Sequence, residues 1–227
     1  MTTLEFHDFI LDNDIIGFFE EPLTLKSGRK SSFYVNWRHT TNDAYLLDQL
    51  TDHVAQFISQ SDIDFTSLIG VPEGASKTAV ITALKIAKLD PKFAKNSHVI
   101  SMGRAKPKSH GAPEDKYFIG CPQGSTYVLE DTVTTGLSLI TFVDQLIKTG
   151  IDVKGVIALT DRGETRDDGL SVEDYLKTTY KGNISYHPLS RARDLIPLAL
   201  EKMTDRGKAE ALREAIASES ITENIEL

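Results

Sequence analysis

Two adjacent carboxylates, Glu130 and Asp131, stand where an apolar run gives way to a Thr/Gly stretch. A turn of this kind between a strand and a helix offers an anion backbone N–H groups and the positive end of the helix dipole. The stretch that would hold a phosphate is Thr132, Val133, Thr134, Thr135, Gly136, Leu137 and Ser138. The two carboxylates would accept hydrogen bonds from sugar hydroxyls or approach a metal. The alternative interpretation is an ordinary turn capped by Thr134 or Thr135, with solvated acids.

Residues 103–116 form a second stretch of interest, polar and interrupted by Gly and Pro. Its cationic residues and its histidine are Arg104, Lys106, Lys108, His110 and Lys116. A long segment without apolar periodicity is typical of a binding loop or lid. Closed over a multiply charged leaving group such as pyrophosphate, this loop would neutralise developing charge and exclude water. The alternative is a solvated surface loop.

A third stretch, residues 23–36, predicts two short strands around a turn at 26–29. The turn would expose Lys26 beside an aromatic pair, Phe33 and Tyr34. A basic hairpin tip next to core aromatics is the alternative interpretation.

Two further strand ends carry charge. Arg162 follows the apolar run 153–160, and its planar guanidinium could grip a carboxylate through two parallel hydrogen bonds. A surface ion pair with Asp161 is the alternative. A turn that contains Glu73 joins another strand to a helix, and its backbone amides could hold an anion, although a simple turn explains it equally well. Glu73 would repel pyrophosphate unless a metal intervenes, and Lys77 could compensate.

The elements that must position these residues alternate from residue 65 onward. Strands are predicted at 65–71, 97–101, 126–130 and 153–160, and helices at 75–87 and 137–148. This alternation predicts an α/β fold with a mostly parallel sheet flanked by helices.

Residues 61–190 make up this core. We expect a smaller module on either side of it, with an acidic, frayed end at residues 218–227. Residues 1–60 predict an α+β hood, with helices beginning at Thr2 and spanning 42–58 around the hairpin. Residues 191–227 predict a helical tail, with helices at 195–203 and 208–217. We therefore expect a single domain over the whole chain.

Composition limits the classes of function. The 227 residues are 40% hydrophobic and 26% charged, which excludes collagen-like, low-complexity and wholly disordered classes. The net charge of −8 offers no global basic field, so we expect neither nucleic acid nor membrane as a partner. No apolar run approaches the about 18 residues of a membrane span, and no signal peptide pattern opens the chain, so we expect a cytoplasmic protein.

The stretch from Glu130 to Ser138 resembles the phosphoribosyl pyrophosphate (PRPP) motif of type I phosphoribosyltransferases. The resemblance implies that Glu130 and Asp131 hold the ribose hydroxyls of PRPP, and that Thr132 to Ser138 cradle its 5′-phosphate. Glu130 stands where Asp is commoner in that family. The whole chain would then take the type I phosphoribosyltransferase fold.

The loop 103–116, the hairpin and the 153–164 segment narrow the resemblance to orotate phosphoribosyltransferases. The loop of that family carries an Arg, a Lys and a His-Gly at the spacing of Arg104, Lys108, His110 and Gly111, which implies that this loop also binds PRPP. The catalytic residues implied are Lys108, His110, Arg104, Lys26 and Asp131. The orotate-binding residues implied are Lys26, Phe33, Tyr34 and Arg162.

The resemblance implies transfer of the phosphoribosyl group of PRPP to orotate, which makes orotidine 5′-monophosphate and pyrophosphate for UMP biosynthesis. It also implies Mg²⁺ bridging pyrophosphate and ribose oxygens, with no ligand assigned to the protein, and a homodimer whose loops complete the neighbouring sites. The chain departs from the family at Glu73 and Ala105, where relatives often carry Lys, and at Ser32, where many carry Pro. Two rivals remain: a noncatalytic PRPP-sensing regulator and a phosphoribosyltransferase for another base.

Overall fold

Four parallel strands form the central sheet of the protein. The computed structural model describes residues 3–25, 28–61, 63–110 and 116–219. The strands lie in the order β3 (Ser67–Gly70), β6 (Ser125–Val133), β7 (Asp152–Asp161) and β8 (Ser185–Pro188). The residues from Val156 to Leu159 in β7 have no exposed surface, as expected for a strand between two neighbours and covered on both faces. The predicted parallel α/β sheet is confirmed.

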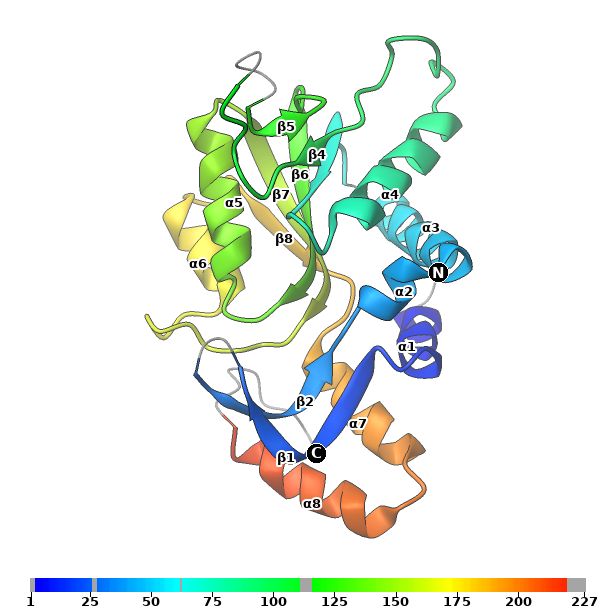
Figure 1. Ribbon diagram of the computed structural model, residues 1–227, viewed down its shortest axis with the longest axis vertical. Coiled ribbons are helices and arrows are strands. Elements are labelled where there is room, and N and C mark those ends of the chain that lie inside the picture. The colour runs from blue at the N-terminus through cyan, green and yellow to red at the C-terminus, as the bar shows by residue number, and fades with distance from the viewer. Residues whose placement is uncertain (1–2, 26–27, 62, 111–115, 220–227) are drawn as a thin grey trace.

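Helices cover both faces of this sheet (Figure 1). On one side lie α3 (Ala44–Gln60) and α4 (Ser76–Leu89), and on the other α5 (Leu137–Lys148) and α6 (Val172–Thr179). The side chain of Asp43 caps α3 by accepting a 2.9 Å hydrogen bond from the N–H of Leu46. The α3 residues Leu47, Leu50, Val54 and Ile58 recur at helical spacing and are buried.

The N-terminal hairpin and the C-terminal helices pack together in a second layer below the sheet (Figure 1). In this layer β1 (Ile16–Thr24) pairs antiparallel with β2 (Lys30–Val35). The helices α7 (Ala192–Lys202) and α8 (Arg206–Ala217) contact β1 and β2 respectively, and α1 (Thr3–Asp12) lies beside them. The predicted hood and helical tail therefore pack together and position the hairpin next to the carboxyl end of β7.

The predicted strand at 97–101 is wrong. These residues have no regular structure, and the next strand, β4 (Met102–Gly103), pairs antiparallel with β5 (Phe118–Ile119) outside the main sheet. Only two large apolar residues, Val99 and Ile100, supported the prediction, and so short a run does not distinguish a strand from an extended loop. The short helix α2 (Arg38–Asn42), α6, β5 and β8 were not predicted. Across the described residues, no helix combines the length and apolar character needed to cross a membrane.

Candidate active site

The acid pair lies at the carboxyl end of β6, where ligands bind in open parallel sheets. Glu130 is 6% exposed, and its Oε1 accepts a 3.1 Å hydrogen bond from the N–H of Asp131. Asp131 is half-buried, and its Oδ1 accepts a 2.7 Å hydrogen bond from the N–H of Thr132. Burial, followed by the nearby charge of Asp131, raises the pKa of Glu130 to about 9. Glu130 is therefore protonated at neutral pH and can donate as well as accept a hydrogen bond.

The Thr/Gly stretch after the acids leads directly into α5. The residue at the helix N-cap is Gly136, with φ at +72°, and no side chain caps the helix. A Cβ at this position would lie 2.9 Å from Cγ2 of Val172, so both backbone and packing require glycine. The alternative interpretation, a turn capped by Thr134 or Thr135 with solvated acids, is wrong. The N–H groups of the first helical turn stay available for an anion.

The side chain of Arg166 holds the turn before α5 in place. Its Nη1 donates a 2.8 Å hydrogen bond to the carbonyl oxygen of Thr135, and its guanidinium carbon lies 3.9 Å from the ring centroid of Tyr175. No motif around Arg166 predicted this positioning role.

A cavity of about 690 Å³, here called the strand-end cavity, opens beside the acid pair. Its lining includes Glu130, Asp131, Thr132 and Ser138 from the predicted PRPP motif, and Val71, Pro72, Glu73, Gly74 and Lys77 from the other strand-to-helix turn. The cavity thus brings together two segments that the sequence separated by more than fifty residues. A Cβ on Gly74 would lie 2.3 Å from Oδ2 of Asp131, so this turn approaches the acid pair as closely as only glycine permits.

The charges on the far wall of the strand-end cavity come from α2 and α4. Lys77 Nζ donates 3.0 Å hydrogen bonds to the carbonyl oxygen of Thr41 and to Oδ1 of Asn42. Arg38, which the sequence analysis missed, also lines this cavity. Both cations line the same cavity as Glu73.

The basic loop extends from the β4–β5 pair, far from the hairpin β1–β2 in Figure 1. Its two sides are joined by hydrogen bonds of Arg104 N–H to Tyr117 O, 2.9 Å, and of Lys108 N–H to Lys116 O, 2.8 Å. Lys108 and His110 are exposed. Of the described loop residues, Ala105 is the one that lines the strand-end cavity. Gly111 lies outside the described residues.

A second cavity of about 260 Å³, here called the hairpin cavity, lies between β1–β2, the strand end after β7 and the end of α8. It is lined by Pro22, Leu25, Arg29, Lys30, Ser31, Ser32, Arg162, Glu164, Ala215, Ser218 and Glu219. Three buried polar atoms of these residues, Arg29 Nη1, Ser32 Oγ and Glu164 Oε2, have no hydrogen-bond partner in the described part of the chain. Unsatisfied buried polar atoms around a cavity point to a polar ligand.

Arg162 lies in the wall of the hairpin cavity and is 4% exposed. Its Nε donates a 2.7 Å hydrogen bond to Glu164 Oε1, and its Nη2 a 2.8 Å bond to Ser31 Oγ. Its guanidinium carbon lies 4.1 Å from the ring centroid of Phe33. The alternative of a surface pair with Asp161 is therefore wrong, and Glu164 is the partner of Arg162.

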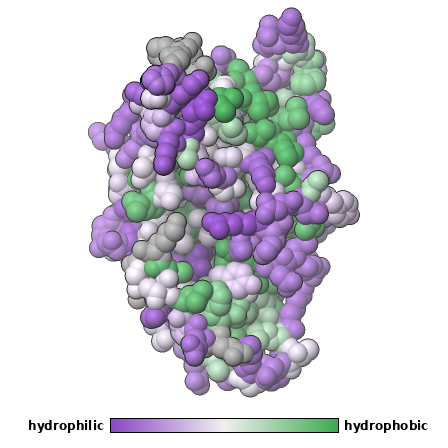
Figure 2. Space-filling model, viewed as in Figure 1, coloured by the Kyte–Doolittle hydropathy of each residue, from purple (hydrophilic) through white to green (hydrophobic). Residues whose placement is uncertain are grey.

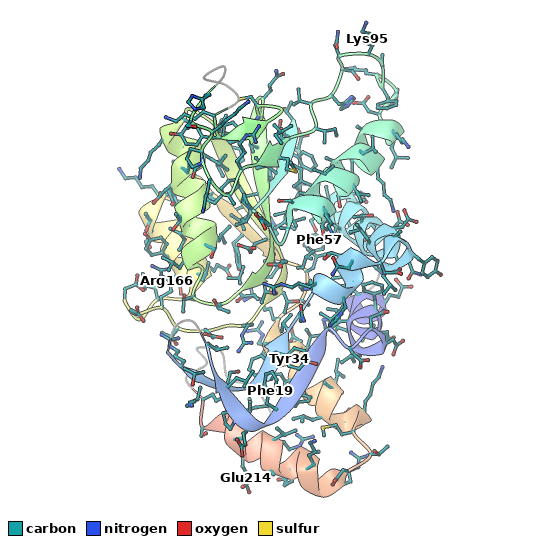
Figure 3. All side chains as sticks on the ribbon, viewed as in Figure 1. Phe19, Tyr34, Phe57, Lys95, Arg166 and Glu214 are labelled. Carbon is teal, nitrogen blue, oxygen red and sulfur yellow. The ribbon has the colours of Figure 1, made fainter. Side chains whose placement is uncertain are left out.

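The other predicted orotate-binding residues are placed differently. Phe33 has no exposed surface, and Tyr34 packs against Phe19 at a centroid distance of 5.0 Å (Figure 3). Neither ring is among the described residues that line the hairpin cavity, whereas Ser31 and Ser32 are. The contact of this aromatic pair with orotate stays a prediction. Lys26 lies outside the described residues.

The chain is similar to known proteins in sequence and in fold. No family model matches the chain. The orotate phosphoribosyltransferase of Vibrio atlanticus is 26% identical over 92% of this chain and 93% of its own length. That of Bradyrhizobium diazoefficiens is 33% identical over 154 residues, which are 64% of this chain and 76% of the relative.

Solved structures show the same fold. The orotate phosphoribosyltransferase of Francisella tularensis superimposes with a TM-score of 0.67 at 21% identity, over 93% of this chain and 98% of the other. This likeness shows the fold. The relative that is 33% identical, of which 76% is covered, shows that the chain belongs to the orotate phosphoribosyltransferase family.

Proposed function

We propose that the protein transfers the 5-phosphoribosyl group of PRPP to orotate, giving orotidine 5′-monophosphate and pyrophosphate in UMP biosynthesis. The observation that carries this proposal is the pair of cavities. The strand-end cavity joins an acid pair to the start of α5, which suits a ribose phosphate. The hairpin cavity offers Arg29, Lys30 and Arg162 to a small anion such as orotate.

In this reaction N1 of orotate attacks the anomeric carbon of PRPP while pyrophosphate leaves, through an oxocarbenium-like state. The protein positions the two reactants and stabilises the charge of the leaving group. Glu130 and Asp131 would hold the ribose hydroxyls, and the turn before α5 the 5′-phosphate. Arg162, held by Glu164 and Ser31, would present its guanidinium to the orotate carboxylate.

We propose that Mg²⁺ enters with PRPP. Within the described residues, no group of three or more His, Cys, Asp or Glu side chains comes together as a metal site. The ion would be held mainly by substrate phosphate oxygens and by one or two carboxylates, as Mg²⁺ commonly is. We propose Asp131, which lines the strand-end cavity, as such a carboxylate. When bound, the ion would neutralise charge on pyrophosphate.

We also propose that the protein works as a cytoplasmic homodimer in which the basic loop reaches the neighbouring subunit's site. Lys108 and His110 are exposed and stand apart from the described lining of their own strand-end cavity, which supports a role in a second copy. Exposed Leu84, Leu89 and Ile119 lie on α4 and β5, and Figure 2 shows apolar surface over these elements. Apolar surface next to the loop suits a subunit interface.

The proposed function is tested by the loss of orotate ultraviolet absorbance in the presence of Mg²⁺ and PRPP. Adenine, guanine, uracil and nicotinate serve as parallel substrates, followed by pyrophosphate release. We expect turnover with orotate alone. Turnover with another base would support the rival phosphoribosyltransferase.

The second rival, a PRPP-sensing regulator, draws support from Glu73 and Ala105, which both line the strand-end cavity. Binding of PRPP without turnover of any base would favour it. Arg162 argues against it, because a sensor of PRPP needs no buried guanidinium in a separate cavity.

A further inference from the structure

The end of the C-terminal helix closes the hairpin cavity. Helix α8 contacts β2, and Ala215, Ser218 and Glu219 line the cavity opposite Arg162. Nothing in the sequence around Glu219 predicts this placement, because the residue lies 187 positions from its partner on the hairpin. The sequence motifs that resemble the orotate phosphoribosyltransferase family end at Glu164.

Glu219 occupies a hydrogen-bond donor of the cavity. Its Oε1 accepts a hydrogen bond of 2.5 Å from the backbone N–H of Ser32. Ser32 is 1% exposed, so while this contact lasts its N–H group is inaccessible to another acceptor. A backbone N–H in a cavity wall is the type of donor that fixes the orientation of a small ligand.

Side chains of both charges line the hairpin cavity with Glu219. The cavity is lined by the cations Arg29, Lys30 and Arg162, and by one further carboxylate, Glu164, which is paired with Arg162. Glu219 therefore adds a second carboxylate to a cavity that three cationic side chains also line, and this carboxylate holds the backbone donor of Ser32. The substrate proposed for this cavity carries a carboxylate of the same charge.

We infer that Glu219 competes with the carboxylate of the substrate for the hairpin cavity and so sets the affinity for orotate. This inference rests on the proposed function. The end of α8 releases Ser32 when orotate binds. The apparent dissociation constant for orotate therefore equals the intrinsic constant divided by the fraction of molecules in which the contact is open. A single hydrogen bond of ordinary net strength predicts an effect of about fivefold.

The test compares Glu219→Ala with a matched control, Glu214→Ala. Glu214 is exposed and lies on the outer side of α8 (Figure 3). The readouts are the KM values for orotate and for PRPP, and the equilibrium dissociation constant of orotate by calorimetry. We expect Glu219→Ala to lower the orotate values about fivefold and to leave the KM for PRPP unchanged, since Glu219 is absent from the described lining of the strand-end cavity. Glu214→Ala should change neither.

Three outcomes separate the inference from the proposed function. No turnover of orotate by the wild-type protein overturns the proposed function. Wild-type turnover with an unchanged orotate KM in Glu219→Ala overturns only the competition by Glu219. A raised orotate KM in that variant also overturns it, because Glu219 would then assist binding. Hydrogen exchange of the Ser32 amide, measured without substrate, should be faster in Glu219→Ala and reports the contact independently of turnover.

Discussion

Replacement of Glu130 by Gln should change how the stability of the protein depends on pH. Burial raises the pKa of Glu130 from 4.5 to about 9, so the folded protein holds a proton there over most of the pH range between these values. The unfolded chain has already lost that proton. Unfolding therefore releases a proton, and the free energy of unfolding falls by about 1.4 kcal/mol for each unit of rising pH. Between pH 6 and 8 this one group would remove up to about 3 kcal/mol.

Gln has the shape of a protonated Glu and cannot ionise. The stability of Glu130→Gln should therefore exceed that of the wild type by a margin that widens with pH. Urea unfolding at pH 6, 7 and 8, followed by tryptophan fluorescence and circular dichroism, measures this margin. Glu214→Gln, an exposed change on α8, serves as the control and should follow the wild type. A constant margin between Glu130→Gln and wild type across these pH values would refute a buried, protonated Glu130.

Three further changes test the site. Lys108→Ala should lower kcat by about two orders of magnitude or more without shifting the melting temperature, because the side chain is exposed; an unchanged kcat would remove the loop from the mechanism. Arg162→Ala leaves the Glu164 carboxylate buried and unpaired and should cost about 3–5 kcal/mol in thermal or urea unfolding, part of which Glu164→Gln should restore. Equal stability of the single and double variants would contradict that pairing. Gly74→Ala should displace Asp131 and raise the KM for PRPP about tenfold with little effect on orotate, and a parallel rise in both KM values would count against it.

The parts of the fold that the sequence predicted well are those with dense local signals. The helix predicted at 137–148 has the same bounds in the structure, because apolar residues recur on one face and Gly136 precedes it. The central strands were predicted for the same reason, since fully buried strands are continuous apolar runs. Strand β8 (Ser185–Pro188) escaped prediction because its residues are only half-buried and include one histidine and one proline.

The two cavities of the candidate site also differ in how local their sequence signals are. The phosphate turn of the strand-end cavity could be predicted because it is local, a strand, a short loop and a helix within a dozen residues. The hairpin cavity could not, because it depends on three distant segments, around Ser32, Arg162 and Glu219, that only the packing of α8 against β2 brings together. Phe33, which the family resemblance assigns to orotate, is fully buried under the guanidinium of Arg162, as the alternative of core aromatics beside a basic hairpin tip expected.

The protonated state of Glu130 resolves an electrostatic conflict in the proposed reaction. The strand-end cavity contains Glu73 as well as the acid pair, yet its proposed ligand carries several negative charges. Two adjacent ionised carboxylates would repel that ligand, and the cations Arg38 and Lys77 would have to offset three acids instead of two. Because burial keeps Glu130 neutral, the cavity retains two hydrogen-bonding carboxyl groups for the ribose hydroxyls with one charge fewer. The affinity for PRPP should therefore weaken as pH rises toward 9, and it should do so less in Glu130→Gln.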